Sequence, residues 1–108
     1  MSGRRSQRKG SRRERELVNA HRELGLRCER IPLSGGSHYQ GCNHDIDLHL
    51  FAGEPPLRCE SKSRATGFKQ IAGWLNGHHV LFLRADHSEV LTVLPWRTWQ
   101  KLLTKQKI

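Results

Sequence analysis

Two runs of alternating polar and apolar residues flank a turn-forming segment near the middle of the chain. The first run, 45–50, reads Asp-Ile-Asp-Leu-His-Leu and alternates strictly, and the second covers 57–63. Such alternation is typical of a β-strand with one face on a core and the other in water. The segment between them, Ala52-Gly53-Glu54-Pro55-Pro56, has the glycine and prolines of a turn. The sequence therefore predicts an antiparallel hairpin, with a core on its apolar face.

The register of this hairpin decides which polar side chains meet. If the turn is symmetric, with its centre between Gly53 and Glu54, Asp47 lies directly opposite Glu60. Directly opposed residues have Cβ atoms about 4.5–5.5 Å apart, and two carboxylates placed there repel each other. Mg²⁺ would offset this repulsion and keep positions for water and phosphate. Lys62, on the same face as Glu60, could steady the attacking water or the developing phosphate charge, which outlines a phosphodiester-hydrolysis site.

Other interpretations of these polar residues stay open. A merely solvated face, with an exposed ion pair between Asp45 and Lys62 that is worth little, also explains the alternation. Asp45 is a second acidic candidate beside Asp47, which we prefer because it pairs with Glu60. The pattern Ser11-x-x-Glu14 matches a capping box at a helix start, which the pattern alone favours, although Glu14 could also reach inward from its helix to a metal.

The composition limits the chain to one core and favours a polyanionic partner. With 108 residues, we expect a flexible basic arm at 1–10 and a single domain at 11–108. The 19 Lys and Arg residues exceed the 10 Asp and Glu residues and give a formal charge of +9, which favours nucleic acid. No run is apolar enough to span a membrane, and no apolar signal core follows the basic N-terminus. We therefore expect a cytoplasmic protein with no membrane partner.

Helical and strand patterns complete the predicted fold. Apolar residues recur at three- and four-residue spacing in 11–26, in 66–76 and in a segment that starts at Pro95, which predicts helices there. Apolar runs at 80–83 and 90–94 predict strands, and an extended run at 27–33 precedes a loop at 34–43. In that loop region, the spacing of His38, Cys42, His44 and His49 matches no familiar zinc pattern. The fold is α/β, in the order α-β-β-β-α-β-β-α, with helices flanking a mixed β-sheet.

An ordered set of short motifs resembles the archaeal-type Holliday junction resolvases, small members of the PD-(D/E)xK, or restriction-endonuclease-like, nuclease superfamily. The set runs from about Arg8 to Leu75 and agrees with that family in order and spacing. Its members are Arg8-Lys9-Gly10-Ser11, Glu14-Arg15-Glu16-Leu17, Arg30-x-Pro32-x-Ser34-Gly35, Asp47, Glu60-Ser61-Lys62-Ser63-Arg64 and Gln70. The resemblance implies a restriction-endonuclease-like core and a homodimer that binds four-way junctions in branched double-stranded DNA and makes paired, symmetric nicks.

The resemblance also implies the catalytic roles. Glu14, Asp47 and Glu60 would bind Mg²⁺, which Mn²⁺ could replace, and Lys62 would assist the attacking water. Gln70 resembles a polar residue that supports the site from the following helix, and an ordinary solvent-facing helix position explains it as well. The expected activity is that of a Mg²⁺-dependent endodeoxyribonuclease that resolves Holliday junctions.

Basic residues and one loop are the DNA-binding candidates. Ser34 and Gly35 look like the junction-contacting loop of the family, and a plain turn is the alternative. The full set of candidates is Arg4, Arg5, Arg8, Lys9, Arg12, Arg13, Arg30, Ser34, Gly35 and Arg64. Two other functions stay open: a related nuclease of the same superfamily that cuts duplexes, flaps or ends, and a non-catalytic basic DNA-binding module.

Overall fold

A three-stranded antiparallel sheet contains the predicted hairpin. The computed structural model describes residues 3–31, 33–34, 37–38 and 44–104. The middle strand, β4 (Ile46–His49), lies between β1 (Arg27–Arg30) and β5 (Leu57–Cys59). On β4, Ile46 and Leu48 are buried, and the residue that follows each of them is partly exposed on the other face. The first predicted strand and its alternation are therefore confirmed, whereas the second, predicted over 57–63, ends at Cys59.

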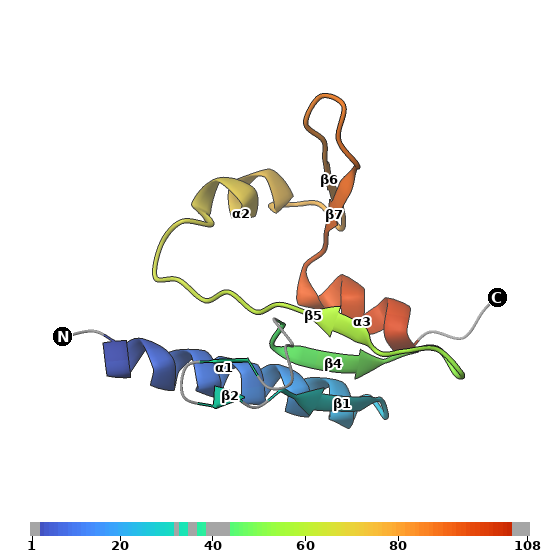
Figure 1. The fold of residues 1–108 in the computed structure, drawn as a ribbon. Helices are drawn as coiled ribbons and strands as arrows, with labels where there is room; N and C mark the ends of the chain where they lie inside the picture. The colour runs from blue at the N-terminus through green and yellow to red at the C-terminus, as the bar shows by residue number, and fades with distance from the viewer. Residues whose placement is uncertain (1–2, 32, 35–36, 39–43, 105–108) are drawn as a thin grey trace. The chain divides into compact units, whose positions relative to one another are not determined.

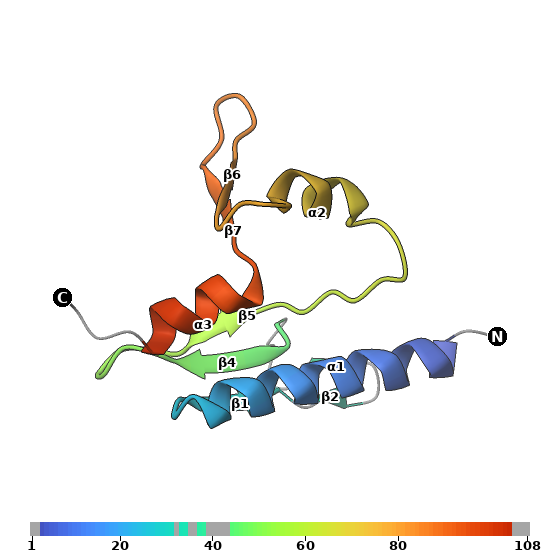
Figure 2. The ribbon, with the colours of Figure 1, turned by 180° about the vertical axis from the view of Figure 1, so that it is seen from behind.

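Helix α1 (Gly3–Glu23) packs against this sheet and completes its core, as Figures 1 and 2 show. Val18 and His21 of α1 are buried together with Cys28 of β1 and the apolar side of β4. The Nδ1 atom of His21 donates a hydrogen bond to the carbonyl oxygen of Leu17 at 2.7 Å. A polar ring nitrogen in this small core is thereby satisfied.

The start of α1 differs from the prediction. The helix begins at Gly3 and not at Ser11, because the Arg, Lys and Gln residues of the basic segment are good helix formers. Ser11-x-x-Glu14 therefore lies inside the helix, and the capping-box interpretation is wrong. After the helix, Gly25 takes a φ of +88°, and its amide donates to the carbonyl oxygen of Arg22 at 2.9 Å. The division into an arm at 1–10 and one domain at 11–108 stays a prediction.

The turn of the hairpin is centred one residue earlier than predicted. The amide of Glu54 donates to the carbonyl oxygen of Phe51 at 3.2 Å, and Gly53, the third residue of this turn, has a φ of +78°. Glycine adopts a positive φ readily, and this fixes the position of the turn. As a result, Asp47 faces Arg58 instead of Glu60. A shift of two residues keeps every side chain on its predicted face of the sheet.

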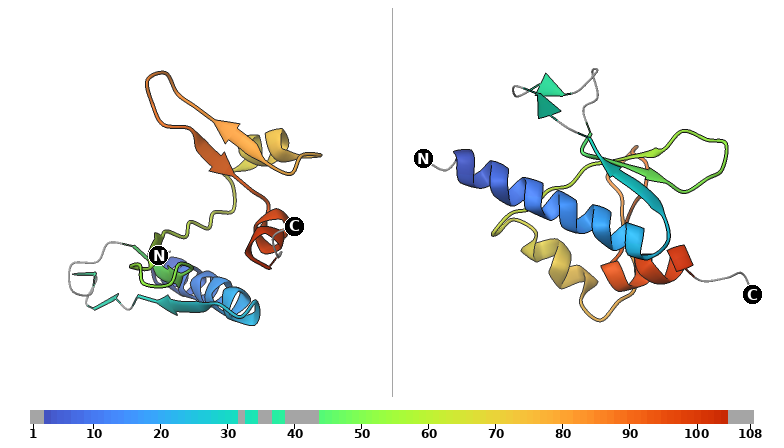
Figure 3. Two further views of the ribbon diagram at one scale, coloured as in Figure 1. Left: turned by 90° about the vertical axis from the view of Figure 1, so that its right-hand side faces the viewer. Right: turned by 90° about the horizontal axis from the view of Figure 1, so that it is seen from below.

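The remaining elements follow the predicted order, with two short strands in addition that the sequence did not predict. They are β2 (Leu33–Ser34), β3 (Ser37–His38), α2 (Lys69–Leu75), β6 (Leu81–Leu83), β7 (Leu91–Val93) and α3 (Trp96–Thr104). β6 and β7 form an antiparallel pair of their own, visible in Figure 3, and β2 and β3 form another within the predicted loop. The chain divides into two units, Met1–Ser63 and Arg64–Ile108.

The fold class is confirmed. Apart from the two-residue strands β2 and β3, the elements have the order α-β-β-β-α-β-β-α, and this order is compatible with a restriction-endonuclease-like core. All strand pairs among the described residues are antiparallel and lie in three separate sheets, so the mixed character predicted for the sheet is not seen there. No helix in the described part of the chain has both the length and the apolar character needed to cross a membrane.

Candidate active site

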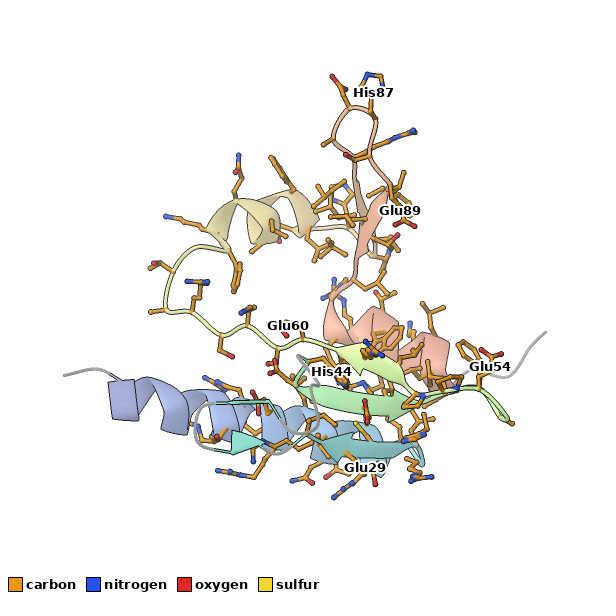
Figure 4. All side chains as sticks on the ribbon, in the orientation of Figure 1. Glu29, His44, Glu54, Glu60, His87 and Glu89 are labelled. Carbon is orange, nitrogen blue, oxygen red and sulfur yellow. The ribbon has the colours of Figure 1, made fainter. Side chains whose placement is uncertain are left out.

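Several candidate residues gather at one end of the three-stranded sheet. Arg30, at the end of β1, pairs with Ile46 at the start of β4, and Ile46 pairs with Cys59 at the end of β5. The chain enters β4 from His44 and leaves β5 with Glu60. These two side chains therefore lie at the same end of the sheet, where Figure 4 labels them.

The carboxylate of Asp47 is held by His44. The Nε2 atom of His44 donates to Oδ1 of Asp47 at 2.5 Å. The side chains are 10% and 21% exposed, so water competes little for this hydrogen bond. On the same face, Glu29 of β1 and Arg58 of β5 are the residues that pair with Asp47. Asp47 thus occupies a polar position in the centre of the sheet with one oxygen fixed.

Glu60 and Lys62 follow β5 and form an ion pair. Nζ of Lys62 lies 3.0 Å from Oε2 of Glu60, and the side chains are 61% and 49% exposed, respectively. An exposed ion pair contributes little to stability, so either side chain can turn toward a substrate at low energetic cost. The register, continued past β5, sets Glu60 opposite Asp45 and makes it a diagonal neighbour of Asp47. The predicted direct opposition of Asp47 and Glu60 is wrong, and diagonal neighbours of this kind are typically about 7–8 Å apart.

Asp45 has a structural explanation of its own. The amide of Ser61 donates to Oδ2 of Asp45 at 2.7 Å, and the amide of Asp45 donates to the carbonyl oxygen of Cys59 at 2.9 Å. Its carboxylate thus fastens the segment after β5 to the start of β4. The register gives the pairing with Glu60 to Asp45, so the criterion that favoured Asp47 no longer holds. Each of the two carboxylates has one oxygen that accepts a hydrogen bond, Asp45 from the Ser61 amide and Asp47 from His44.

Glu14 reaches from α1 to Arg30. The Nε atom of Arg30 donates to Oε1 of Glu14 at 2.8 Å, and its Nη2 atom donates to Oγ of Ser11 at 2.8 Å. The side chain of Glu14 is 16% exposed and that of Arg30 is 31% exposed. A charge-assisted hydrogen bond in this setting joins α1 to the end of β1. The contact brings Glu14 to the strand end at which Glu60 leaves the sheet.

The donor chemistry suits a hard cation, although the ligands are not assembled into one group. Among the described side chains, no cluster of three or more His, Cys, Asp or Glu residues is placed to hold a metal ion. Asp47 of β4 and Glu60, directly after β5, nevertheless offer carboxylate oxygens, the donor type that Mg²⁺ prefers. The two described cysteines, Cys28 and Cys59, compete little with these oxygens for a metal, because burial raises the pKa of both thiols.

Comparison with known protein families yields a match over residues 5–80 to the archaeal Holliday junction resolvases (Hjc). This match covers more than half of the 108-residue chain. The chain belongs to the archaeal Holliday junction resolvase family. No curated protein and no solved structure matches the chain significantly. The family match confirms the resemblance of the sequence motifs. The chain is a Holliday junction resolvase nuclease. Its family acts on junction DNA and generally uses divalent metal ions.

The predicted DNA-binding residues of this resolvase differ in their surroundings. Arg12, Arg13 and Arg64 are exposed, and Arg13 also forms an ion pair with Glu16 at 3.2 Å. Gln70 is exposed on α2. The side chains of Arg4, Arg5, Arg8, Lys9 and Ser34, and the whole of Gly35, lie outside the described residues.

His44 is the residue at this site of the resolvase to which the sequence analysis gave no role. It was considered only with His38, Cys42 and His49, whose spacing matches no zinc pattern. The one signal in the sequence is its position three residues before Asp47. A spacing of three residues predicts a contact only if the backbone conformation before β4 is known, and the sequence does not give that conformation.

Proposed function

We propose that this chain is a metal-dependent endodeoxyribonuclease that resolves four-way junctions by paired, symmetric nicks. The observation that carries the proposal is that the register, continued past β5, makes Glu60 a diagonal neighbour of Asp47 of β4, with Lys62 two residues further on, in a member of the resolvase family. Hard oxygen donors next to a mobile ammonium are the groups that phosphodiester hydrolysis requires.

Each residue has a distinct task in this proposal. Asp47, Glu60 and Glu14 hold Mg²⁺, or Mn²⁺ in its place, through carboxylate oxygens. The bound ion supplies Lewis-acid polarisation of the phosphate and a more acidic water. Lys62 donates a hydrogen bond to the attacking water or to a phosphate oxygen, and it can leave Glu60 to do so because the ion pair is exposed. Gln70 supports the site from α2.

DNA binding in the proposal is mainly electrostatic. The formal charge is +9, and exposed Arg12, Arg13 and Arg64 are available to phosphates. Phosphate contacts position a protein without reading sequence, so selectivity for a junction comes from its shape and from the two-fold symmetry of a dimer.

The homodimer of the proposal rests on the paired nicks, which need two active sites on one junction. In the second unit, Phe82 and Leu91 of the β6–β7 pair are 68% and 61% exposed, and the register puts them on opposite faces of the pair. Such apolar side chains are available for contacts with a second copy of the chain.

Cleavage of a labelled four-way junction and of a matched linear duplex, each with Mg²⁺ or with chelator, tests the proposed function. We expect junction-confined nicks with Mg²⁺ and none with chelator. Asp47→Asn and Glu60→Gln should lower the cleavage rate by about 100-fold or more, as the loss of a transition-state contact does. Glu54→Gln is the matched control, since Glu54 is an exposed carboxylate in the turn, labelled in Figure 4.

The other outcomes point to different functions. Equal cutting of the duplex would indicate a related nuclease without junction selectivity. Tight binding without any cutting would indicate a DNA-binding module. Normal cleavage by Asp47→Asn would contradict the assignment of the active site.

A further inference from the structure

His44 is a buried polar residue that the proposed function does not use. It lies two residues before β4, and 8% of its surface is exposed. Its Nε2 atom donates to Asp47 at 2.5 Å, and its Nδ1 atom is buried without a hydrogen-bond partner among the described residues. An ionised carboxylate only accepts hydrogen bonds, so Nε2 carries the proton in this contact.

The other neighbours of Asp47 do not hold its carboxylate. Arg58 pairs with Asp47 across the strands, but no ion pair joins their side chains within the described part of the chain. Glu29, which pairs with Asp47 on the other side, has its carboxylate near His49 at 3.4 Å and near Arg27 at 3.7 Å. Among the described residues, the imidazole of His44 is therefore the group that orients this carboxylate.

The ring of His44 supplies a donor that matches the carboxylate of Asp47. An apolar side chain of similar size would lack the hydrogen bond from Nε2 to Oδ1 of Asp47. Metal-binding carboxylates are commonly oriented by hydrogen bonds from a neighbouring residue, and these partners affect the affinity for the metal. The His44–Asp47 contact has this form.

We propose that His44 is a positioning residue that fixes Oδ1 of Asp47, so that its Oδ2 atom is presented to the divalent metal ion. This inference rests on the proposed role of Asp47 as a metal ligand. His44 itself touches neither the metal nor the DNA. The hydrogen bond restricts the carboxylate before the ion binds, so less conformational entropy is lost on binding.

Substitutions that separate the hydrogen bond from the packing of the ring test this inference. His44→Phe keeps a ring without a donor, and His44→Gln keeps an N–H donor at the position of Nε2. His49→Phe is the matched control, because His49 is also a histidine of this sheet face with a carboxylate contact, that with Glu29. The readouts are the Mn²⁺ affinity of the DNA-free protein, followed by electron paramagnetic resonance, and kcat and KM for junction cleavage.

The proposal predicts a specific pattern among these variants. His44→Phe should weaken Mn²⁺ binding about 10- to 100-fold and lower kcat at fixed metal, with the KM for the junction unchanged. His44→Gln should restore most of the affinity, and His49→Phe should resemble the wild type. Wild-type Mn²⁺ affinity in His44→Phe would overturn the inference, and so would equal losses in His44→Phe and His44→Gln.

A second measurement does not depend on whether a variant at position 44 folds. In wild-type protein with ¹⁵N-labelled histidine, the Nε2–H resonance of His44 should shift on addition of Mg²⁺, and this shift should be absent in Asp47→Asn. An unchanged resonance would overturn the inference. If Asp47→Asn binds Mn²⁺ and cleaves normally, the proposed function of Asp47 also fails. If Asp47→Asn loses Mn²⁺ binding and cleavage while His44→Phe keeps Mn²⁺ binding and cleavage, only the proposed role of His44 fails.

Discussion

Each of the three predicted metal-binding carboxylates has a different partner. Glu14 accepts from Arg30, Asp47 accepts from His44, and Glu60 lies against Lys62. The register makes Asp47 and Glu60 diagonal neighbours, so the carboxylate that directly faces Glu60 is that of Asp45. Two of these contacts are partly buried and the third is exposed, so their contributions to stability differ.

Arg30 provides a prediction at the scale of single residues. Arg30→Gln should lower the free energy of unfolding by about 1–2 kcal/mol, because it leaves the Glu14 carboxylate without its charge-assisted partner. Chemical denaturation measures this loss. Arg27→Gln is the control and should change stability by less than about 0.5 kcal/mol, since Arg27 is 70% exposed and lies 3.7 Å from Glu29. Equal losses in both variants would contradict the structural role given to the Arg30–Glu14 pair.

At the scale of elements, Gly53 sets the register of the β4–β5 hairpin. Gly53→Ala should destabilise the protein by about 1 kcal/mol, since an L-residue at a φ of +78° is strained although the space around it is open. Gly73→Ala is the control, because it lies inside α2 in open space, where alanine favours the helix by about 0.5–1 kcal/mol. Unfolding midpoints that move in the same direction for the two substitutions would contradict this account of the turn.

Local sequence patterns predicted most helices and strands. They predicted the strand register and the start of α1 less well. Alternation in 45–50 was sufficient to predict β4 and its buried face. The register was wrong because it depends on which residue of the turn adopts a positive φ, and symmetry about the segment is an imperfect guide to that. The start of α1 was placed too late because the basic segment resembled a loose arm, although its residues favour a helix.

In the candidate site, too, contacts between residues close in sequence were predictable and contacts between elements were not. Glu60 and Lys62 are close in sequence and share a face, so their proximity followed from strand periodicity. The contact between Glu14 and Arg30 depends on how α1 packs on β1, and no sequence pattern encodes it. His44 reaches Asp47 from outside the regular strand, where alternation no longer applies, so its contact with Asp47 was missed.

At the scale of the whole molecule, the proposal requires two active sites that act on one junction. A chain of 108 residues with a formal charge of +9 can bind DNA phosphates as a monomer, but a single active site would leave one strand of each symmetric pair uncut. Paired cutting therefore depends on a two-fold assembly with matching geometry in the substrate.

Cleavage of a supercoiled plasmid that extrudes a cruciform tests this central claim most directly. Two nicks made within one bound complex convert the plasmid straight to linear DNA, whereas independent nicks first produce a relaxed, nicked circle. With Mg²⁺, the account predicts linear product from the start of the reaction, and no cutting of a plasmid that lacks the inverted repeat. Accumulation of nicked circles before linear product, or equal cutting of both plasmids, would contradict it.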